Sequence, residues 1–226
     1  MRTRLNNLTF GAFVSVALMT GAGSAFGAAS ATITADNHYS LYTGSPASGI
    51  TLLGGNELGA GGNPGTYNWS MAENFIFEPG DFIYIATWSD DAVAQGLLAD
   101  ITLPSGEVIL SGDSRWEYIA TNIDLDDGAP WPAASEISAY VAAADLAGTW
   151  SAPDIGGTNG VSPWGNIAGV SGSSKWMLGN PDRATDPFHG GMDHEEYQIF
   201  RMPVPTPGTA SLAGLAGLVF LRRRKA

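Results

Sequence analysis

Short β-prone runs closed by Gly- or Pro-containing turns dominate the middle of this chain. The most β-prone run, residues 82–88, follows the turn Pro79-Gly80-Asp81 and is rich in β-branched and aromatic residues. Residues 39–43 alternate large apolar with small polar side chains, the period of a half-buried strand. The other expected strands are residues 31–35, 51–53, 74–78, 96–103, 107–110, 114–120 and 195–202. Many short strands with turns between them predict an all-β fold, an antiparallel β-sandwich.

Helical and disulfide signals are sparse. Residues 136–146 have Ala-rich, helix-like spacing that predicts one or two helical turns, and residues 148–191 are loop-rich. The chain has 30 Gly, 13 Pro and no Cys, while hydrophobic residues make up 44% of it. A domain without disulfides has to rely on its own apolar core or on bound ions.

The C-terminus combines a proline-rich motif, an apolar run and a basic end. The motif is Val204-Pro205-Thr206-Pro207-Gly208, the apolar run covers residues 209–221, and the basic end is Arg222-Arg223-Arg224-Lys225. As a helix the run would span only about 20 Å, whereas a bilayer core needs about 30 Å. The cations would stay on the cytoplasmic side. This pattern favours a transient inner-membrane segment that is later cut, with an ordinary C-terminal anchor helix as the alternative.

This arrangement resembles the PEP-CTERM tail that Gram-negative bacteria present to an exosortase. The resemblance implies an exosortase-type processing enzyme as a partner. It also implies a final location at the cell surface, the outer membrane or the extracellular matrix. Thr206 departs from the family pattern, which has Glu between its prolines, and so leaves the identity of the processing enzyme open.

The N-terminus has the three regions of a signal peptide. Arg2 and Arg4 form the positive region, residues 8–19 the apolar region, and Ala25-Phe26-Gly27 the small-x-small cleavage site. We therefore expect export through the Sec machinery and cleavage by signal peptidase after Gly27. The expected organisation is a signal peptide over 1–27, a sandwich domain over 28–202 and a sorting tail over 203–226.

The exported domain is far more acidic than the whole chain. Four of the ten Lys and Arg residues and all 22 Asp and Glu residues lie between the two signals, which leaves a formal charge of −18. The remaining cations are Arg115, Lys175, Arg183 and Arg201. Binding of nucleic acid needs many cations facing phosphates, so this function class is excluded.

The order of several segments in the domain resembles the galactose-binding-like jelly roll of lectin-like modules. The segments that carry the resemblance are residues 34–42, 79–86, 96–101, 111–116, 175–176 and 197–201. The resemblance implies a lectin-like jelly roll over nearly the whole exported domain. Tyr42-Thr43-Gly44 replaces the family's short Tyr-x-Asn-Gly ending. Because binding in such folds occurs in edge loops, the ligand does not carry over.

Four tryptophans lie in loop-like segments beside polar side chains. An exposed aromatic ring can stack on the apolar face of a sugar while nearby amides and carboxylates bind its hydroxyls. Trp88, Trp116 and Trp176 lie in or against expected strands and are assigned to the core. The alternative for the loop tryptophans is that they too cover the core. The candidates for sugar stacking are Trp69, Trp131, Trp150 and Trp164.

Two acidic segments suggest metal binding. Asp124, Asp126 and Asp127 place three carboxylates in one turn, which is ligand chemistry for Ca²⁺, although the spacing does not complete an EF-hand. The alternative is a solvated acidic turn. Residues 189–196 gather two His and three acidic residues without a known metallohydrolase spacing, which favours a surface loop over a zinc site.

The preferred prediction is an exported, surface-sorted, non-enzymatic β-sandwich that binds carbohydrate or an extracellular polysaccharide. The second hypothesis is a structural component of a matrix or biofilm whose assembly Ca²⁺ assists. A third is a secreted hydrolase. The sequence contains no G-x-S-x-G elbow and no cysteine nucleophile. Its abundant acids leave paired carboxylates for glycoside hydrolysis open.

Overall fold

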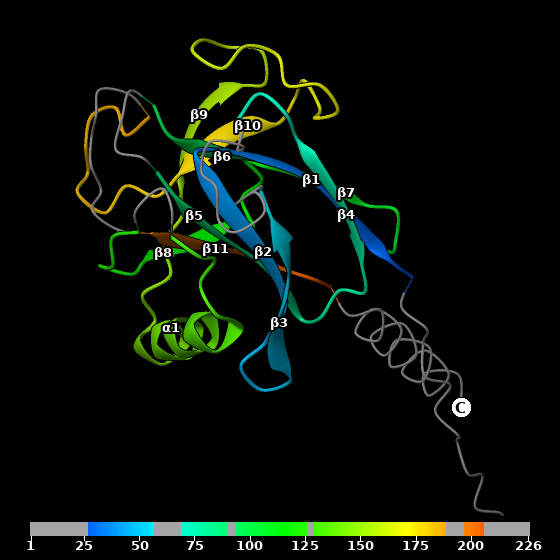
Figure 1. The fold of residues 1–226 in the computed structure, drawn as a ribbon, viewed down its shortest axis with the longest axis vertical. Helices are drawn as coiled ribbons and strands as arrows, with labels where there is room; N and C mark the ends of the chain where they lie inside the picture. The colour runs from blue at the N-terminus through cyan, green and yellow to red at the C-terminus, as the bar shows by residue number, and fades with distance from the viewer. Residues whose placement is uncertain (1–26, 57–68, 90–93, 126–128, 189–196, 206–226) are drawn as a thin grey trace, which may run out of the picture.

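Two antiparallel sheets face each other in the computed structural model, which describes residues 27–56, 69–89, 94–125, 129–188 and 197–205 (Figure 1). All pairings between named strands are antiparallel. The prediction of an all-β, antiparallel sandwich is confirmed. The first sheet has the order β4 (Glu73–Phe77), β1 (Ala29–Asp36), β6 (Gly96–Thr102), β10 (Lys175–Leu178), β9 (Asp154–Thr158), and β7 (Val108–Leu110) also pairs with β6. The second has the order β3 (Gly49–Gly55), β2 (His38–Ser45), β5 (Phe82–Trp88), β11 (Gln198–Pro203), β8 (Glu117–Ala120).

Strand alternation places one apolar layer between the sheets. On β5, Ile83 and Ile85 are fully buried in this central core, whereas Tyr84 and Ala86 pack on the opposite face. This is the two-residue period of a strand whose faces are both covered. The central core also takes Ile33 and Ile101 from the first sheet. Burial of these side chains supplies the main favourable free energy of a domain that has no disulfide.

The helix α1 (Ala134–Ala147) covers the outer face of the second sheet. It has 14 residues, about four turns, so the prediction of one or two turns was too short. Ile137, Val141 and Ala144 are its buried residues and pack against the aromatic outer face of the sheet. Tertiary packing on one face therefore extends a helix whose isolated sequence signal is weak.

A second covering lies on the outer face of the first sheet. Trp164 and Ile167 pack with Trp176 and Leu178 of β10. Asn159 holds this covering segment in place, because its Nδ2 donates to the carbonyl oxygen of Ile167 (3.0 Å) and its Oδ1 accepts from the Ile167 N–H (2.8 Å). Much of the loop-rich stretch after residue 148 is thus packed structure without regular hydrogen bonding.

Both ends of the described chain lie at the same end of the sandwich, toward the lower right of Figure 1. β11 runs to Pro203, and the Val204 N–H donates to the Asp81 carbonyl oxygen at 2.9 Å. The Val204 side chain belongs to the central core. The sandwich therefore continues into the first two residues that the sequence assigned to the tail, while Thr206 and all later residues lie outside the described part.

Four buried tyrosines make the stability of the sandwich sensitive to alkaline pH. Burial raises the pKa of Tyr39, Tyr42, Tyr84 and Tyr197 above the ordinary tyrosine value, in the case of Tyr42 to about 12. Tyr39 and Tyr197 also donate hydrogen bonds to carboxylates, of Glu73 and Glu136, at 2.7 Å each. A neighbouring carboxylate disfavours the phenolate further.

We predict that the free energy of unfolding is insensitive to these tyrosines below about pH 10 and falls above it. The unfolded chain releases the phenolic protons near pH 10, whereas the folded chain holds them. Each of the four should therefore cost up to about 1.4 kcal/mol for every pH unit above that value. Urea unfolding at about pH 8 and about pH 11 measures the difference. Equal stability at the two pH values would contradict the prediction.

A matched pair of isoleucines tests the position of the central core. Ile33 on β1 is fully buried, whereas Ile76 on the neighbouring strand β4 is 82% exposed. We expect Ile33→Ala to lower the free energy of unfolding by about 2–5 kcal/mol, and Ile76→Ala by less than about 1 kcal/mol. Urea denaturation of both variants is the measurement. Similar losses of stability from the two substitutions would contradict the assignment of Ile33 to the core and of Ile76 to the surface.

Candidate functional site

The candidate site is a hollow of about 270 Å³ beside the edge strand β8, called the β8 hollow below. Three segments that are far apart in the sequence line it. They are β8 itself, the chain that follows α1, and the turn that follows β10. The lining residues are Tyr118, Ile119, Ala120, Thr149, Ser151, Asn180, Pro181 and Arg183.

The end of α1 positions the first wall of the hollow. Gly148 adopts the left-handed conformation (φ 65°), and its N–H donates to the Ala144 carbonyl oxygen at 2.8 Å, which ends the helix. Three residues later, Ser151 and Tyr118 exchange backbone hydrogen bonds of 2.8 and 3.1 Å. Thr149 and Ser151 are both exposed and bring two hydroxyl groups to the hollow.

A turn over residues 180–183 forms the opposite wall. The Arg183 N–H donates to the Asn180 carbonyl oxygen at 3.3 Å, and the Asn180 N–H donates to the Tyr118 hydroxyl at 2.9 Å. The Asn180 side chain fixes the turn, because its Oδ1 accepts from the Ala184 N–H (2.7 Å) and its Nδ2 donates to Asp154 (2.6 Å). Arg183 itself has φ 56°, a conformation that costs a residue with a side chain about 1–2 kcal/mol. The surrounding hydrogen bonds hold this turn against that strain.

A buried polar clamp supports the turn from below. Gln198 on β11 is 3% exposed, its Oε1 accepts from the Gly179 N–H (2.7 Å), and its Nε2 donates to the Gly179 carbonyl oxygen (3.2 Å). The clamp joins the end of β10 in one sheet to the start of β11 in the other. Gly179 also lies so close to Tyr118 that a Cβ there would be 2.2 Å from the tyrosine ring. A side chain at this position would therefore force the Tyr118 ring or the Gln198 side chain to shift.

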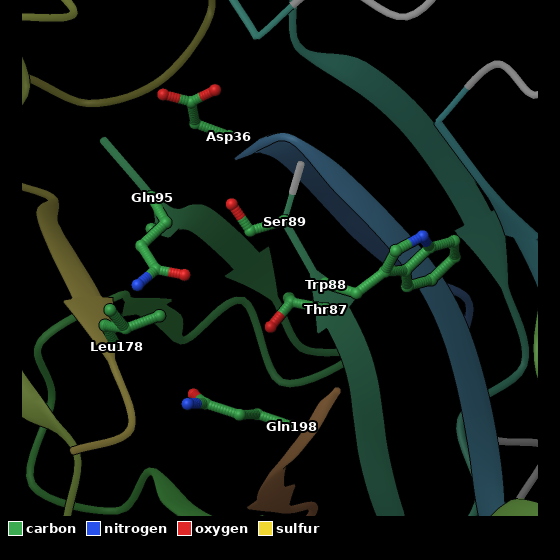
Figure 2. Close-up of a pocket in the computed structure, with 8 residues that line it drawn as sticks. Asp36, Thr87, Trp88, Ser89, Gln95, Leu178 and Gln198 are labelled. Atoms are coloured by element: carbon green, nitrogen blue, oxygen red, sulfur yellow. The ribbon is translucent and has the colours of Figure 1, made fainter. Parts of the chain in front are cut away.

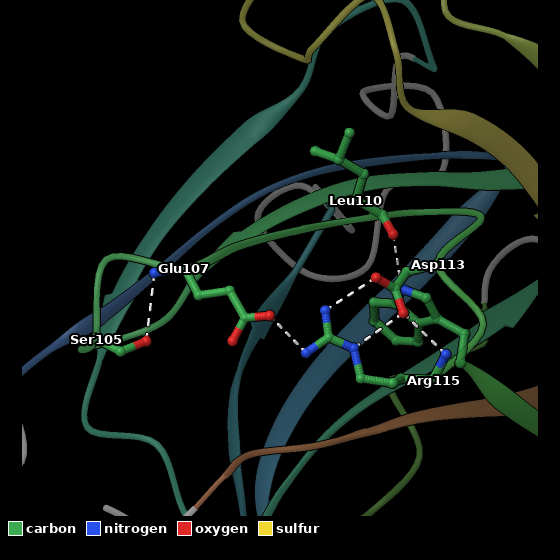
Figure 3. Close-up of polar contacts among 6 residues, drawn as sticks. Ser105, Glu107, Leu110, Asp113 and Arg115 are labelled. Carbon is green, nitrogen blue, oxygen red and sulfur yellow. Dashed lines mark hydrogen bonds and ion pairs between the residues drawn. The ribbon is translucent and has the colours of Figure 1, made fainter.

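Two of the four cations of the domain are neutralised by carboxylates. Arg115 pairs with Asp113 at 2.9 Å and with Glu107 at 2.7 Å (Figure 3), and the hydrogen bonds that its guanidinium donates to Asp113 raise the pKa of Arg115. Arg201 pairs with two carboxylates as well, those of Glu117 (2.8 Å) and Asp145 (2.5 Å).

Arg183 differs from both. Within the described ranges it has no ion pair, and it is the one cation among the residues that line the β8 hollow. The fourth cation, Lys175, is exposed on β10 and does not line the hollow. The hollow thus combines hydroxyl, amide and guanidinium groups, which can bind the hydroxyls and charged groups of a polar ligand.

A second cavity opens between the two sheets, at the end of the sandwich where β1 and β5 finish (Figure 2). It measures about 10 Å³, which is about the space for one water molecule. Its polar groups are engaged: Ser89 donates to Asn37 Oδ1 (3.1 Å), and Asp36 accepts from Trp164 Nε1 (2.7 Å). In Figure 2 the Trp88 ring points away from Gln95 and Gln198. This cavity is too small for a sugar.

Two of the four candidate tryptophans lie over the first sheet. Trp164 is 5% exposed and stacks on Trp176, with ring centroids 4.1 Å apart. Trp69 is half-buried against the same cluster, and its carbonyl oxygen accepts from Thr34 Oγ1 at 2.6 Å. Trp164 therefore belongs to a packed layer, which agrees with the alternative interpretation that the loop tryptophans cover the core.

The other two lie over the second sheet. Trp131 and Trp150 are half-buried against the cluster beneath α1. The Arg201 guanidinium lies 3.7 Å from the centroid of the Trp150 ring, and Trp150 Nε1 donates to Asp145 at 2.8 Å. The four tryptophans thus belong to opposite outer faces and do not form one platform. Sugar stacking on any one of them stays a prediction.

The predicted calcium turn lies partly outside the described residues. Asp124 is exposed, whereas Asp126 and Asp127 fall in the range that the structure leaves undescribed. In the part that it describes, no three His, Asp or Glu residues are grouped as a metal site would need. The acidic segment 189–196 and the motif residues Thr206, Pro207 and Gly208 also lie outside the described residues, as do the basic residues 222–225. Among the helices of the described ranges, none has the length and apolarity to span a bilayer.

The class of protein that the fold defines is a two-sheet antiparallel β-sandwich with both outer faces partly covered. Comparisons with protein-family models, with curated proteins and with solved structures found no match. Sequence reasoning counted Arg183 among the four cations but did not place it in a site. Asn180-Pro181-Asp182 is a turn signal. The segments that line the hollow with this turn, however, lie far from it along the chain.

The close contact at Gly179 provides a test of the site geometry. We predict that Gly179→Ala lowers the free energy of unfolding by about 1–3 kcal/mol, because the new methyl group would overlap the Tyr118 ring and the Gln198 side chain. Gly172→Ala is the control, since no atom lies within 4 Å of the Cβ added there. Urea unfolding compares the two variants. A Gly179→Ala chain as stable as the Gly172→Ala chain would contradict the described contact.

Proposed function

We propose that this protein is an exported, surface-sorted β-sandwich that binds an extracellular polysaccharide, without enzymatic activity, in the β8 hollow. The observation that carries the proposal is the lining of this hollow. The exposed hydroxyl side chains of Thr149 and Ser151 and the Arg183 guanidinium come together around a volume of about 270 Å³. Sugar hydroxyls need such groups, and the volume is close to the lower limit of small-ligand pockets, about 300 Å³.

The hydrogen-bonded construction of the hollow supports a binding role. Asn180 and Tyr118 are held by bonds of 2.6–3.0 Å, so the walls are organised before a ligand arrives. A site that is already ordered avoids part of the entropy cost of binding. Binding residues are commonly carried on loops that a rigid scaffold positions, and the sandwich is such a scaffold.

The predicted sorting signals support a location where polysaccharides are found. The tail with its PEP-CTERM-like motif is expected to bring the protein to an exosortase and then to the cell surface or matrix. The described chain ends toward the lower right of Figure 1, whereas β8 lies on the left side of the sandwich. A domain held by its C-terminal end would therefore present the hollow away from its attachment.

The resemblance to galactose-binding-like jelly rolls agrees with this assignment at the level of architecture. This protein and those jelly rolls share an architecture of two antiparallel sheets. That the protein is itself a lectin-like jelly roll is part of the proposal. Lectin-like modules of this class bind sugars in loops at the edge of the sandwich. The β8 hollow lies at such an edge, between β8 and the turn after β10.

We predict that the purified protein binds oligosaccharides on a glycan array and that Thr149→Trp abolishes this binding. The large ring would occupy the hollow, which Thr149 lines from an exposed position. The matched control is Thr51→Trp, at another exposed threonine, on β3 at the other edge of the second sheet. Isothermal titration calorimetry of the best array ligand compares both variants with the unchanged protein.

The array should be run with Ca²⁺ and with a chelator. Retention of a glycan that Thr149→Trp removes and Thr51→Trp preserves supports the proposal. Failure to retain any glycan, together with Ca²⁺-dependent self-association, overturns it and favours a structural matrix component. Turnover of a polysaccharide by the protein would instead favour a hydrolase.

A further inference from the structure

We infer that the β8 hollow selects sugars that carry a carboxylate, and that Arg183 is the residue that recognises the acid group. This inference rests on the proposed function and names the class of glycan for that same site. A guanidinium can bind a carboxylate through two parallel hydrogen bonds, which gives both strength and directional selectivity. The chemistry points to uronic acids, the sugars in which a carboxylate replaces the terminal hydroxymethyl group.

The pairing of the other arginines is the first argument. The domain is strongly acidic, and Arg115 and Arg201 each contact two carboxylates. In the described ranges Arg183 has no such contact, although Asp154 is near its turn. The Oδ2 atom of Asp154 accepts the Asn180 amide at 2.6 Å, so this carboxylate helps to build the wall of the hollow. The Arg183 guanidinium is left to bind a ligand.

The backbone at Arg183 is the second argument. A left-handed conformation (φ 56°) is unfavourable for arginine and would suit glycine or asparagine better. The turn nevertheless carries arginine there, and hydrogen bonds between the Asn180 side chain and the Ala184 backbone and from the Arg183 N–H to the Asn180 carbonyl oxygen hold it. Strained residues concentrate at functional sites, where the surrounding structure holds them in place. Presentation of the guanidinium to a ligand would explain why the turn keeps arginine in this strained conformation.

The negative charge of the whole domain limits non-specific binding of acidic sugars. A formal charge of −18 repels anions at long range, so a polyanion gains little from non-specific attraction. Recognition of an acidic sugar must therefore come from short-range contacts in the hollow. The hydroxyl groups of Thr149 and Ser151 line the hollow and are available to bind the sugar ring, whereas the Asn180 amide holds the turn. Selectivity for the acid should then depend on Arg183.

Two probes and two variants test the inference. Tri-galacturonate and its methyl ester have the same sugar ring, but the ester lacks the charge. Arg183→Gln removes the guanidinium from the hollow, and Lys175→Gln makes the same change of net charge at an exposed cation outside it. Calorimetry on the full exported domain gives Kd for each pair, and urea unfolding verifies that both variants fold.

We expect the unchanged protein to bind tri-galacturonate at least about tenfold more tightly than the methyl ester. Arg183→Gln should remove this difference by weakening binding of the acid, while leaving binding of the ester within about twofold. Lys175→Gln should preserve the full difference. Equal binding of acid and ester by the unchanged protein, or an equal loss in both variants, would overturn the role of Arg183 and leave the proposed function standing. If neither trisaccharide binds but neutral glycans on the array do, the choice of ligand class is wrong; if no glycan binds at all, the proposed function itself fails.

Discussion

Burial of apolar side chains between two sheets holds this protein together, and the rest of the structure depends on that contact. The chain has no cysteine, so no disulfide adds to the stability that the core supplies. Each sheet also has an outer face too apolar to be left in water, so α1 covers one and the segment around Trp164 covers part of the other. The β8 hollow is lined in part by the chain that follows α1, so its position depends on where this helix ends.

The clamp between Gln198 and Gly179 shows how the core and the hollow are coupled. The buried Gln198 amide makes one hydrogen bond through its oxygen and one through its nitrogen to the backbone of Gly179, and breaking them would leave polar groups unpaired in the interior. The clamp fixes the end of β10 against β11, and the turn that carries Arg183 starts at the next residue. Interior packing therefore fixes the position of this wall, and the recognition chemistry that we propose belongs to the exposed residues above it.

The tryptophans illustrate how a composition that suits sugar binding can serve packing. Seven tryptophans in an acidic exported chain suggest aromatic platforms, and four of them lie in segments without a strand pattern. Trp164 lies flat on Trp176, and Trp150 is covered on one side by Arg201. In a domain with two covered sheets, loops carry core residues as strands do. Sequence position in a loop is therefore a poor guide to exposure here.

The sequence by itself determined the class of fold and most strand positions, because a two-residue period and Gly- or Pro-containing turns are local signals. Residues 82–88 coincide with β5 as predicted, and the acidic balance of the domain is read directly from the chain. Tertiary structure alone decided the length of α1, the burial of Trp164 and the position of Arg183 beside Thr149 and Ser151. These features depend on contacts between segments that are separate in the sequence, and no local pattern records which segments will meet.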